Sequence, residues 1–224
     1  MLLLAVMSIA LASCEKDDDH MANVENGHKW VDLGLPSGLK WATCNVGATK
    51  PEGPGNLYAW GETTTKDYYF WDSYQWNEPA FYMSLTKYLE AGECLSIDDD
   101  AAAVNWGGSW RMPTIDNWQE LINTEYCTSE FIYQNGVHGR KFTSLSNGNS
   151  IFLPAVNCCL FESSRIDNFD PGTYWSSSLS EDDPYDAYVL QFRLTACGIG
   201  RATRIVGIPV RAVCKLAECQ RKSK

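Results

Sequence analysis

The feature that most constrains the fold is the alternation of side chains near the C-terminal end of the chain. Between positions 187 and 192, Tyr188, Leu190 and Phe192 alternate with Ala187, Val189 and Gln191. Further on, Val206, Ile208, Val210 and Ala212 occupy every second position. Successive side chains of a strand point to opposite faces, so a period of two is typical of a half-buried strand. We therefore predict strands over 187–192 and 206–214.

Helical periodicity precedes these strands. Thr114 is a good N-cap, and the apolar residues Ile115, Trp118, Leu121 and Ile122 that follow it fall on one face of a helix. A shorter helix is expected after Asp98, Asp99 and Asp100, whose carboxylates suit its positive N-terminus. Further strands are predicted at 29–33, 39–43, 140–143, 150–154 and 174–177. Helices early and antiparallel strands late predict an α+β fold.

The N-terminal segment reads as an export signal. Residues 1–13 hold an apolar run that is too short to span a bilayer, which takes roughly 20 residues. Leu11, Ala12, Ser13 and Cys14 form a string typical of the lipobox of bacterial lipoproteins, with Cys14 as the lipidated residue. An acidic linker follows. The expected organisation is a signal peptide at 1–13, lipidated cysteine and linker at 14–27, one domain at 28–214 and a basic tail at 215–224.

Composition limits the classes of ligand and cofactor that the chain can bind. The net charge of −10 argues against nucleic acid, since phosphate binding needs clustered Lys and Arg. Nine Trp, eleven Tyr and eight Phe can supply a large core. The other eight cysteines could form disulfides in an exported chain, but none has the paired spacing of a zinc site. A calcium site at Asp98–Asp100 is the alternative to the helix start; because adjacent side chains there diverge, we predict no metal and no cofactor.

Long strings in the chain resemble the Fibrobacter succinogenes major paralogous domain family. They are VDLGLPSGLKWATCNVGA at 31–48, YAWGET at 58–63, DDAA at 99–102, NWGGSWRMPT at 105–114, GNSIFLPA at 148–155, YWSSS at 174–178 and VRAVC at 210–214. The resemblance implies a loop-rich, C-type-lectin-like fold with one or two helices packed on a small twisted antiparallel sheet. Because such a fold brings its ends together, it also implies a disulfide or a close contact between Cys44 and Cys214.

The resemblance carries little chemistry. The formylglycine-generating enzymes are similar in fold, but their cysteine pair near a Trp-Glu-Trp-Cys type string has no counterpart, and Cys158 and Cys159 are adjacent. His20, His28 and His138 stand in linker or turn contexts without the partners of a catalytic triad. Calcium-dependent lectins use a Glu-Pro-Asn loop and a Trp-Asn-Asp strand, whereas this chain has Trp175 followed by serines. We therefore predict no enzyme and no metal-dependent sugar site.

A restricted alphabet marks the C-terminal region. Residues 193–208 and 163–174 lack Lys, Glu, Gln, Trp and Met, the five amino acids that codons ending in a pyrimidine cannot encode. Diversity-generating retroelements yield such an alphabet in the variable proteins they diversify, and drift in an exposed region is the alternative. Variable loops on a rigid sheet are a common way to build a recognition surface. The expected ligand-binding residues are Asp183, Tyr185, Asp186, Arg193, Thr195, Arg201, Thr203 and Arg204.

Together these features predict a non-catalytic recognition protein of a Gram-negative bacterium, attached by its lipid to the outer membrane or cell surface. Its C-terminal loops could be hypervariable, and its partner would be an extracellular protein or a glycan. The alternative is a structural envelope or adhesin subunit without a dedicated ligand site. A large exposed aromatic and apolar patch would favour recognition, and a smooth charged face would favour the structural role.

Overall fold

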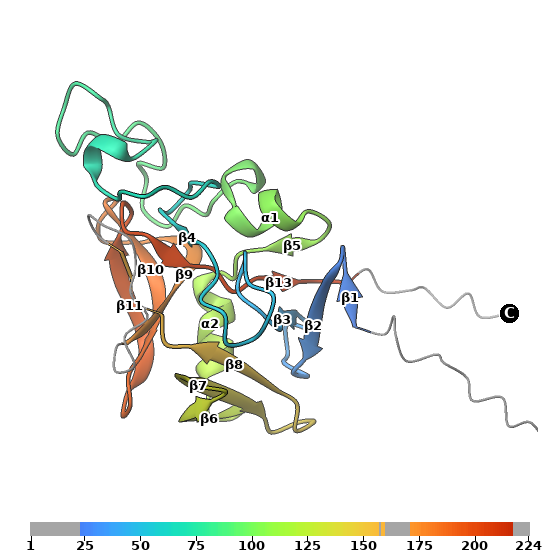
Figure 1. Cartoon of the computed structure of the whole chain (residues 1–224). Helices are drawn as coiled ribbons and strands as arrows, with labels where there is room; N and C mark the ends of the chain where they lie inside the picture. Colours follow the sequence, from blue (N-terminus) through green and yellow to red (C-terminus); the bar gives the residue numbers. More distant parts are fainter. Residues whose placement is uncertain (1–22, 157, 160–170, 217–224) are drawn as a thin grey trace, which may run out of the picture.

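The computed structural model describes residues 23–156, 158–159 and 171–216 (Figure 1). The described part of the chain is rich in β-sheet, with 36% of the described residues in strands and 11% in helices, so the predicted α+β, C-type-lectin-like class is wrong. Several antiparallel sheets replace the single small one. Two long strands, β6 (Cys127–Gln134) and β11 (Cys197–Thr203), lie where we predicted no strand. Most of their side chains are exposed or half-buried, so apolar periodicity could not reveal them.

The largest sheet joins the two ends of the domain. Its order is β1 (Val24–Glu25), β2 (His28–Asp32), β3 (Lys40–Ala42), β13 (Val213–Cys214) and β5 (Trp110–Arg111). The strands β2 and β3 match the predicted segments at 29–33 and 39–43 to within one residue at each end. β1 lies inside the segment we expected to be linker. The last strand pairs with the third, with Cys214 opposite Lys40.

That register explains why the predicted disulfide is wrong. Cys44 and Cys214 are both free thiols. Because Cys214 faces Lys40 across the pair, Cys44 lies four residues past its cross-strand partner and two residues beyond the end of β3, so the register does not place the two cysteines opposite each other. A disulfide needs Cα atoms within about 7 Å. The two ends of the domain do meet, as expected, but the two cysteines do not.

A second sheet carries the predicted recognition segments. It has the order β11, β10 (Asp186–Phe192) and β9 (Gly172–Leu179), and β11 forms one edge. β10 is buried on both faces, because Ala187 and Val189 belong to one core cluster and Leu190 and Phe192 to another. The alternation therefore located the strand correctly but misjudged it as half-buried.

Two smaller sheets complete the β structure. One contains β6, β7 (Val137–Ser144) and β8 (Ser150–Pro154), and the last of these has the predicted bounds. The other pairs β4 (Leu57–Tyr58) with β12 (Ile208–Pro209). The predicted strand at 206–214 is thus two short strands in different sheets. Arg211 between them is fully buried.

Both predicted helices form as expected. α2 (Ile115–Ile122) starts after Thr114, whose hydroxyl accepts from the backbone N–H of Asn117 while the Asn117 side chain accepts from Thr114. α1 (Ala101–Trp106) is capped by Asp100, whose carboxylate accepts from the N–H groups of Ala102 and Ala103. Short 3₁₀ turns, η1 (Trp71–Ser73) and η2 (Ile97–Asp99), precede them.

Indole N–H groups tie the core clusters to the sheets. Trp175 of β9 is fully buried and donates to the carbonyl of Tyr58 at 2.8 Å, and Trp60 donates to the carbonyl of Ser176 at 2.9 Å. Trp118 of α2 donates to the carbonyl of Trp175 at 3.2 Å. Trp175 is therefore a core residue and has no exposed face on which a sugar could stack.

Candidate recognition surface

The predicted ligand-binding residues lie at two opposite ends of the β10–β11 pair. Asp186 faces Thr203 at one end, and Phe192 faces Cys197 at the other. Six residues of strand separate these ends, about 20 Å. Arg193 and Thr195 belong to the connecting turn at the second end, so they do not share one surface with Asp183, Tyr185 and Thr203.

The turn end is held by a buried cation. Arg140 of β7 is 6% exposed and donates from Nη2 to the carbonyl of Arg193 at 2.8 Å and that of Ala196 at 3.3 Å. Its Nε is buried and has no hydrogen-bond partner in the described part of the chain. A cavity of about 280 Å³ lies beside the turn, lined partly by Arg193 and Cys197. Arg193 and Thr195 are exposed, and Cys197 is half-buried.

The other end of the strand pair is shaped by the turn at 180–186. Asp183 accepts from the N–H of Tyr185 at 2.9 Å, and the Ser180 hydroxyl accepts from the N–H of Asp182 at 3.2 Å. Arg201 of β11 reaches across to Asp182 with an N···O distance of 2.7 Å. Arg201 is exposed, while Asp183, Tyr185, Asp186 and Thr203 are half-buried.

Arg204 was predicted to bind ligand, and this prediction is wrong. The residue is fully buried and cannot contact a ligand. Its Nε donates to the hydroxyl of Tyr74 at 2.9 Å. Its two terminal nitrogens donate to the carbonyls of Lys87, Tyr88 and Pro184 at 2.9 to 3.1 Å. The guanidinium also lies 4.9 Å from the ring centroid of Trp60. Arg204 therefore fastens two distant loops to the end of β11.

One of these loops was missed by the sequence reasoning. We call residues 66–90 the aromatic loop, and Figure 1 shows it rising beyond the end of β10 and β11. Trp71 and Tyr74 are buried, whereas Phe81 is 66% exposed and Tyr82 is 70% exposed. The density of Tyr, Trp and Phe in this stretch was the signal that could have revealed a surface cluster.

Tyr185 joins the aromatic loop to the predicted site. Its hydroxyl donates to the carbonyl of Met83 at 2.9 Å, and its ring meets that of Trp71 edge to face at 5.6 Å. Tyr82 in turn lies 6.2 Å from Phe70 and 6.4 Å from Trp71. The aromatic loop and the 180–186 turn with Arg201 thus form one continuous surface, which we call the aromatic end.

A buried carboxylate closes the base of the aromatic loop. Asp99 accepts from the ammonium of Lys87 and the hydroxyls of Tyr88 and Ser96. Burial acts to raise the pKa of Asp99, but the hydrogen bonds from Lys87 and Tyr88 outweigh it and hold the pKa below 3.8. The Lys87 ammonium also lies 4.4 Å from the ring centroid of Trp76.

We expect this closure to depend on pH. A carboxyl whose pKa is lowered by folding stabilises the folded state above its unfolded pKa, near 3.8, and loses that contribution as the pH falls. Asp99→Asn should cost about 1.5 kcal/mol at neutral pH, the worth of a hydrogen bond to a charged group. Tryptophan fluorescence followed from pH 7 down to pH 2 should show, below about pH 4, an acid transition that the variant lacks. An unchanged transition in Asp99→Asn would assign it to another group.

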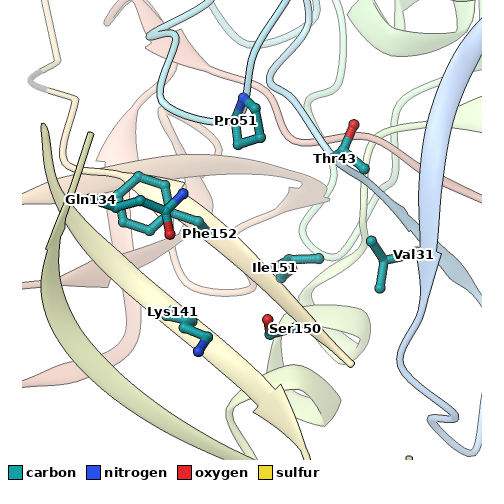
Figure 2. Close-up of a pocket in the computed structure, with 8 residues that line it drawn as sticks. All are labelled: Val31, Thr43, Pro51, Gln134, Lys141, Ser150, Ile151 and Phe152. Atoms are coloured by element: carbon teal, nitrogen blue, oxygen red, sulfur yellow. The ribbon is translucent and has the colours of Figure 1, made fainter. Parts of the chain in front are cut away.

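Two further cavities lie away from the aromatic end. Figure 2 shows the smaller, about 150 Å³, with Val31 and Thr43 on one side and Ile151, Ser150 and Lys141 on the other. Beside it Glu52 is buried, and hydrogen bonds from Gln134 and Asn135 outweigh burial to lower its pKa. Because its volume is only about 150 Å³, this cavity is a poor candidate for a large ligand.

The larger cavity, about 420 Å³, is lined by residues that include His28, Cys44 and Trp106. His28 stacks on Trp106 with ring centroids 3.9 Å apart, and burial lowers the pKa of His28. His138 stacks on Phe131 at 5.7 Å. Both histidines are therefore packed against aromatic rings; His20 and Cys14 lie outside the described residues.

No family model, curated protein or solved structure matches the chain. Within the described residues, no group of three or more His, Cys, Asp or Glu side chains is placed to hold a metal ion. The aromatic end presents the exposed rings of Phe81 and Tyr82, and it contacts the predicted ligand-binding residue Tyr185 directly.

Close packing limits which positions behind the aromatic end can vary. A Cβ on Gly207 would lie 2.7 to 2.9 Å from ring atoms of Tyr69, a buried residue whose hydroxyl donates to the carbonyl of Leu57. We expect Gly207→Ala to lower the free energy of unfolding by about 1–3 kcal/mol through overpacking. Gly198→Ala is the matched control, because nothing lies within 4 Å of its Cβ. Equal urea midpoints for the two variants would contradict the expectation.

Proposed function

We propose that the chain is a lipid-anchored surface protein whose domain recognises a ligand and catalyses no reaction. The observation that carries the proposal is the aromatic end. Phe81 and Tyr82 present two large rings to solvent on a loop that is itself fixed by buried aromatic residues. Contiguous exposed apolar patches on soluble proteins mark interaction or ligand-binding sites.

The base of the aromatic end is rigid enough to present those rings. Tyr69, Trp71 and Tyr74 are buried, with exposures of 2 to 4%. The Tyr74 hydroxyl donates to the carbonyl of Trp60 at 2.7 Å, and Arg204 holds the loop from below. A preorganised loop loses less conformational entropy when it binds, which favours recognition.

The position of the aromatic end suits a tethered receptor. In Figure 1 the aromatic loop and β1, the first described strand, lie on different sides of the molecule. If lipid at Cys14 tethers the chain on the side of β1, the rings face away from the membrane. Within the described residues, no helix is long and apolar enough to cross a bilayer. We also propose membership of the Fibrobacter succinogenes major paralogous domain family, which rests on the sequence strings alone.

We also propose that the C-terminal region is hypervariable, over a shorter range of residues than the restricted alphabet alone indicates. The restricted alphabet covers β11, whose backbone pairs with β10 over seven residues while its side chains stay partly exposed. Such positions tolerate substitution, because the backbone makes the pairing. Arg204, Ile205 and Gly207 are buried, so we propose that any diversification that the fold tolerates ends at about residue 203.

Recognition can be tested with the Cys14→Ala chain on arrays of peptides and glycans. We expect saturable binding that the double variant Phe81→Ser with Tyr82→Ser loses. Tyr133→Ser is the matched control, because Tyr133 is 63% exposed on a different sheet, and it should bind normally. Absence of binding to every array member, or equal loss in the control, would favour the structural envelope role instead.

The anchor has its own test. Cys14→Ala removes the only thiol in the lipobox string, so we expect the protein to leave the membrane fraction or to accumulate unprocessed. Two acyl chains give stable anchoring where a single chain is marginal, so the shift should be nearly complete. Membrane fractionation followed by immunoblotting measures it. Unchanged fractionation would rule out Cys14 as the lipid site.

A further inference from the structure

We propose that the aromatic end binds a cationic, arginine-rich polypeptide segment. This inference rests on the proposed recognition function and names its partner class. Two observations support it: rings that are exposed, and a local surplus of carboxylates that have no ion-pair partner in the described part of the chain.

The charge balance of the aromatic loop is uneven. Its two lysines are already paired, Lys66 with Glu62 at 2.8 Å and Lys87 with Asp99. Its four acidic residues, Asp67, Asp72, Glu78 and Glu90, form no salt bridge within the described residues. The neighbouring turn adds Glu181, which is exposed. The unpaired charge around the rings is therefore negative, and it favours a positive partner.

The rings of this region already bind cations inside the molecule. Lys66 lies 5.4 Å from the ring centroid of Tyr69, and Lys87 lies 4.4 Å from that of Trp76. Arg204 lies 4.9 Å from that of Trp60. Each pair places a cation over a ring face, the geometry of a cation–π interaction. Phe81 and Tyr82 offer the same chemistry to an external cation, with the carboxylates nearby.

Arginine suits this surface better than lysine. Its planar guanidinium stacks on a ring and can still donate in the ring plane to a carboxylate, whereas a lysine ammonium is a compact and strongly hydrated point charge. Asp72 follows the buried Trp71 in η1, and the N–H of Phe81 donates to the carbonyl of Glu78 at 3.0 Å. Asp72 and Glu78 therefore lie on the same loop as Phe81 and Tyr82, with Glu78 one backbone turn before Phe81. A second copy of this chain is a poor occupant, because its net charge is −10.

The test uses a fluorescent peptide of arginines separated by glycines, and the same peptide with citrulline in place of each arginine. Citrulline keeps the shape and removes the charge. We expect the arginine peptide to bind the full chain with saturable anisotropy and the citrulline peptide to bind about tenfold more weakly. Raising the salt from 50 to 500 mM should weaken arginine binding several-fold.

Variants separate the two parts of the surface. Phe81→Ser with Tyr82→Ser should weaken arginine binding about tenfold, and Asp72→Asn with Glu78→Gln should weaken it and reduce its salt dependence. Tyr133→Ser should change neither the affinity for the arginine peptide nor the salt dependence of that binding. Glu78 is half-buried and the other substituted residues are exposed, so all of these variants should leave thermal unfolding nearly unchanged.

The outcomes also separate this inference from the proposed function. Equal binding of the arginine and citrulline peptides, or unchanged binding in the ring variant, overturns the cationic partner. If the arrays show that a neutral glycan binds through Phe81 and Tyr82 while the arginine peptide does not bind, the proposed recognition function is supported and the cationic partner is ruled out. If nothing binds at the aromatic end, both the recognition function and the cationic partner are ruled out.

Discussion

Arg211→Met is expected to lower the free energy of unfolding by about 3–4 kcal/mol, because three buried acceptors and one half-buried acceptor would lose a partner worth roughly 1 kcal/mol each. Arg211 is fully buried. Its Nε donates to the Asn45 side chain at 2.9 Å, and its terminal nitrogens donate to the carbonyls of Ala42, Thr43 and Phe152 at 3.0 to 3.1 Å. Burial lowers the pKa of Arg211.

The effect should be global, because these acceptors come from separate parts of the fold. Ala42 ends β3, Phe152 belongs to β8, and Arg211 lies two residues before β13. Removing the guanidinium charge from the interior offsets part of the loss, but methionine cannot donate to any of the four acceptors. Urea unfolding measures the change. Arg201→Met is the control and should cost less than about 1 kcal/mol, since its ion pair with Asp182 is exposed. Equal losses in the two variants would contradict the role of Arg211.

The sequence predicted elements where periodicity or capping was strong. Thr114 located the start of α2 and Asp100 that of α1, because a capping side chain acts on its own neighbours. The positions of β8 and β10 followed from their apolar residues. Local patterns could not predict how the strands divide into sheets, since that depends on pairings between residues far apart, such as Val213 with Trp41. The fold class was wrong for that reason.

The candidate site was predicted only in part. Tyr185 and Arg201 were identified from the restricted alphabet and its flanking turn, and they lie at the aromatic end. Arg193 and Thr195 were grouped with them although β10 and β11 hold them at the opposite end. Phe81 and Tyr82 were missed because a loop without periodicity gives no sign of which rings face solvent. The same sequence window also holds Arg204, which the structure buries.

Arg204→Met is expected to open the aromatic end as well as to destabilise the chain. The substitution removes four hydrogen bonds, to Tyr74, Lys87, Tyr88 and Pro184, so we expect the free energy of unfolding to fall by about 3–4 kcal/mol at roughly 1 kcal/mol per hydrogen bond. Three of the four acceptors belong to the aromatic loop and the fourth to the 180–186 turn. The variant should therefore loosen the surface that we propose for recognition before it unfolds the sheets.

Hydrogen exchange can distinguish this local opening from a global one. In the native loop the N–H of Glu78 donates to the carbonyl of Ser84 at 2.7 Å, and that of Thr86 donates to the carbonyl of Trp76 at 2.9 Å. In Arg204→Met these amides should exchange through local opening well before those of β9 and β10, whereas Arg211→Met should lower protection throughout the sheets. Arginine-peptide binding should fall with the loop protection, since the rings lose their fixed base. Uniform loss of protection in Arg204→Met, or full binding despite an opened loop, would separate Arg204 from the recognition surface.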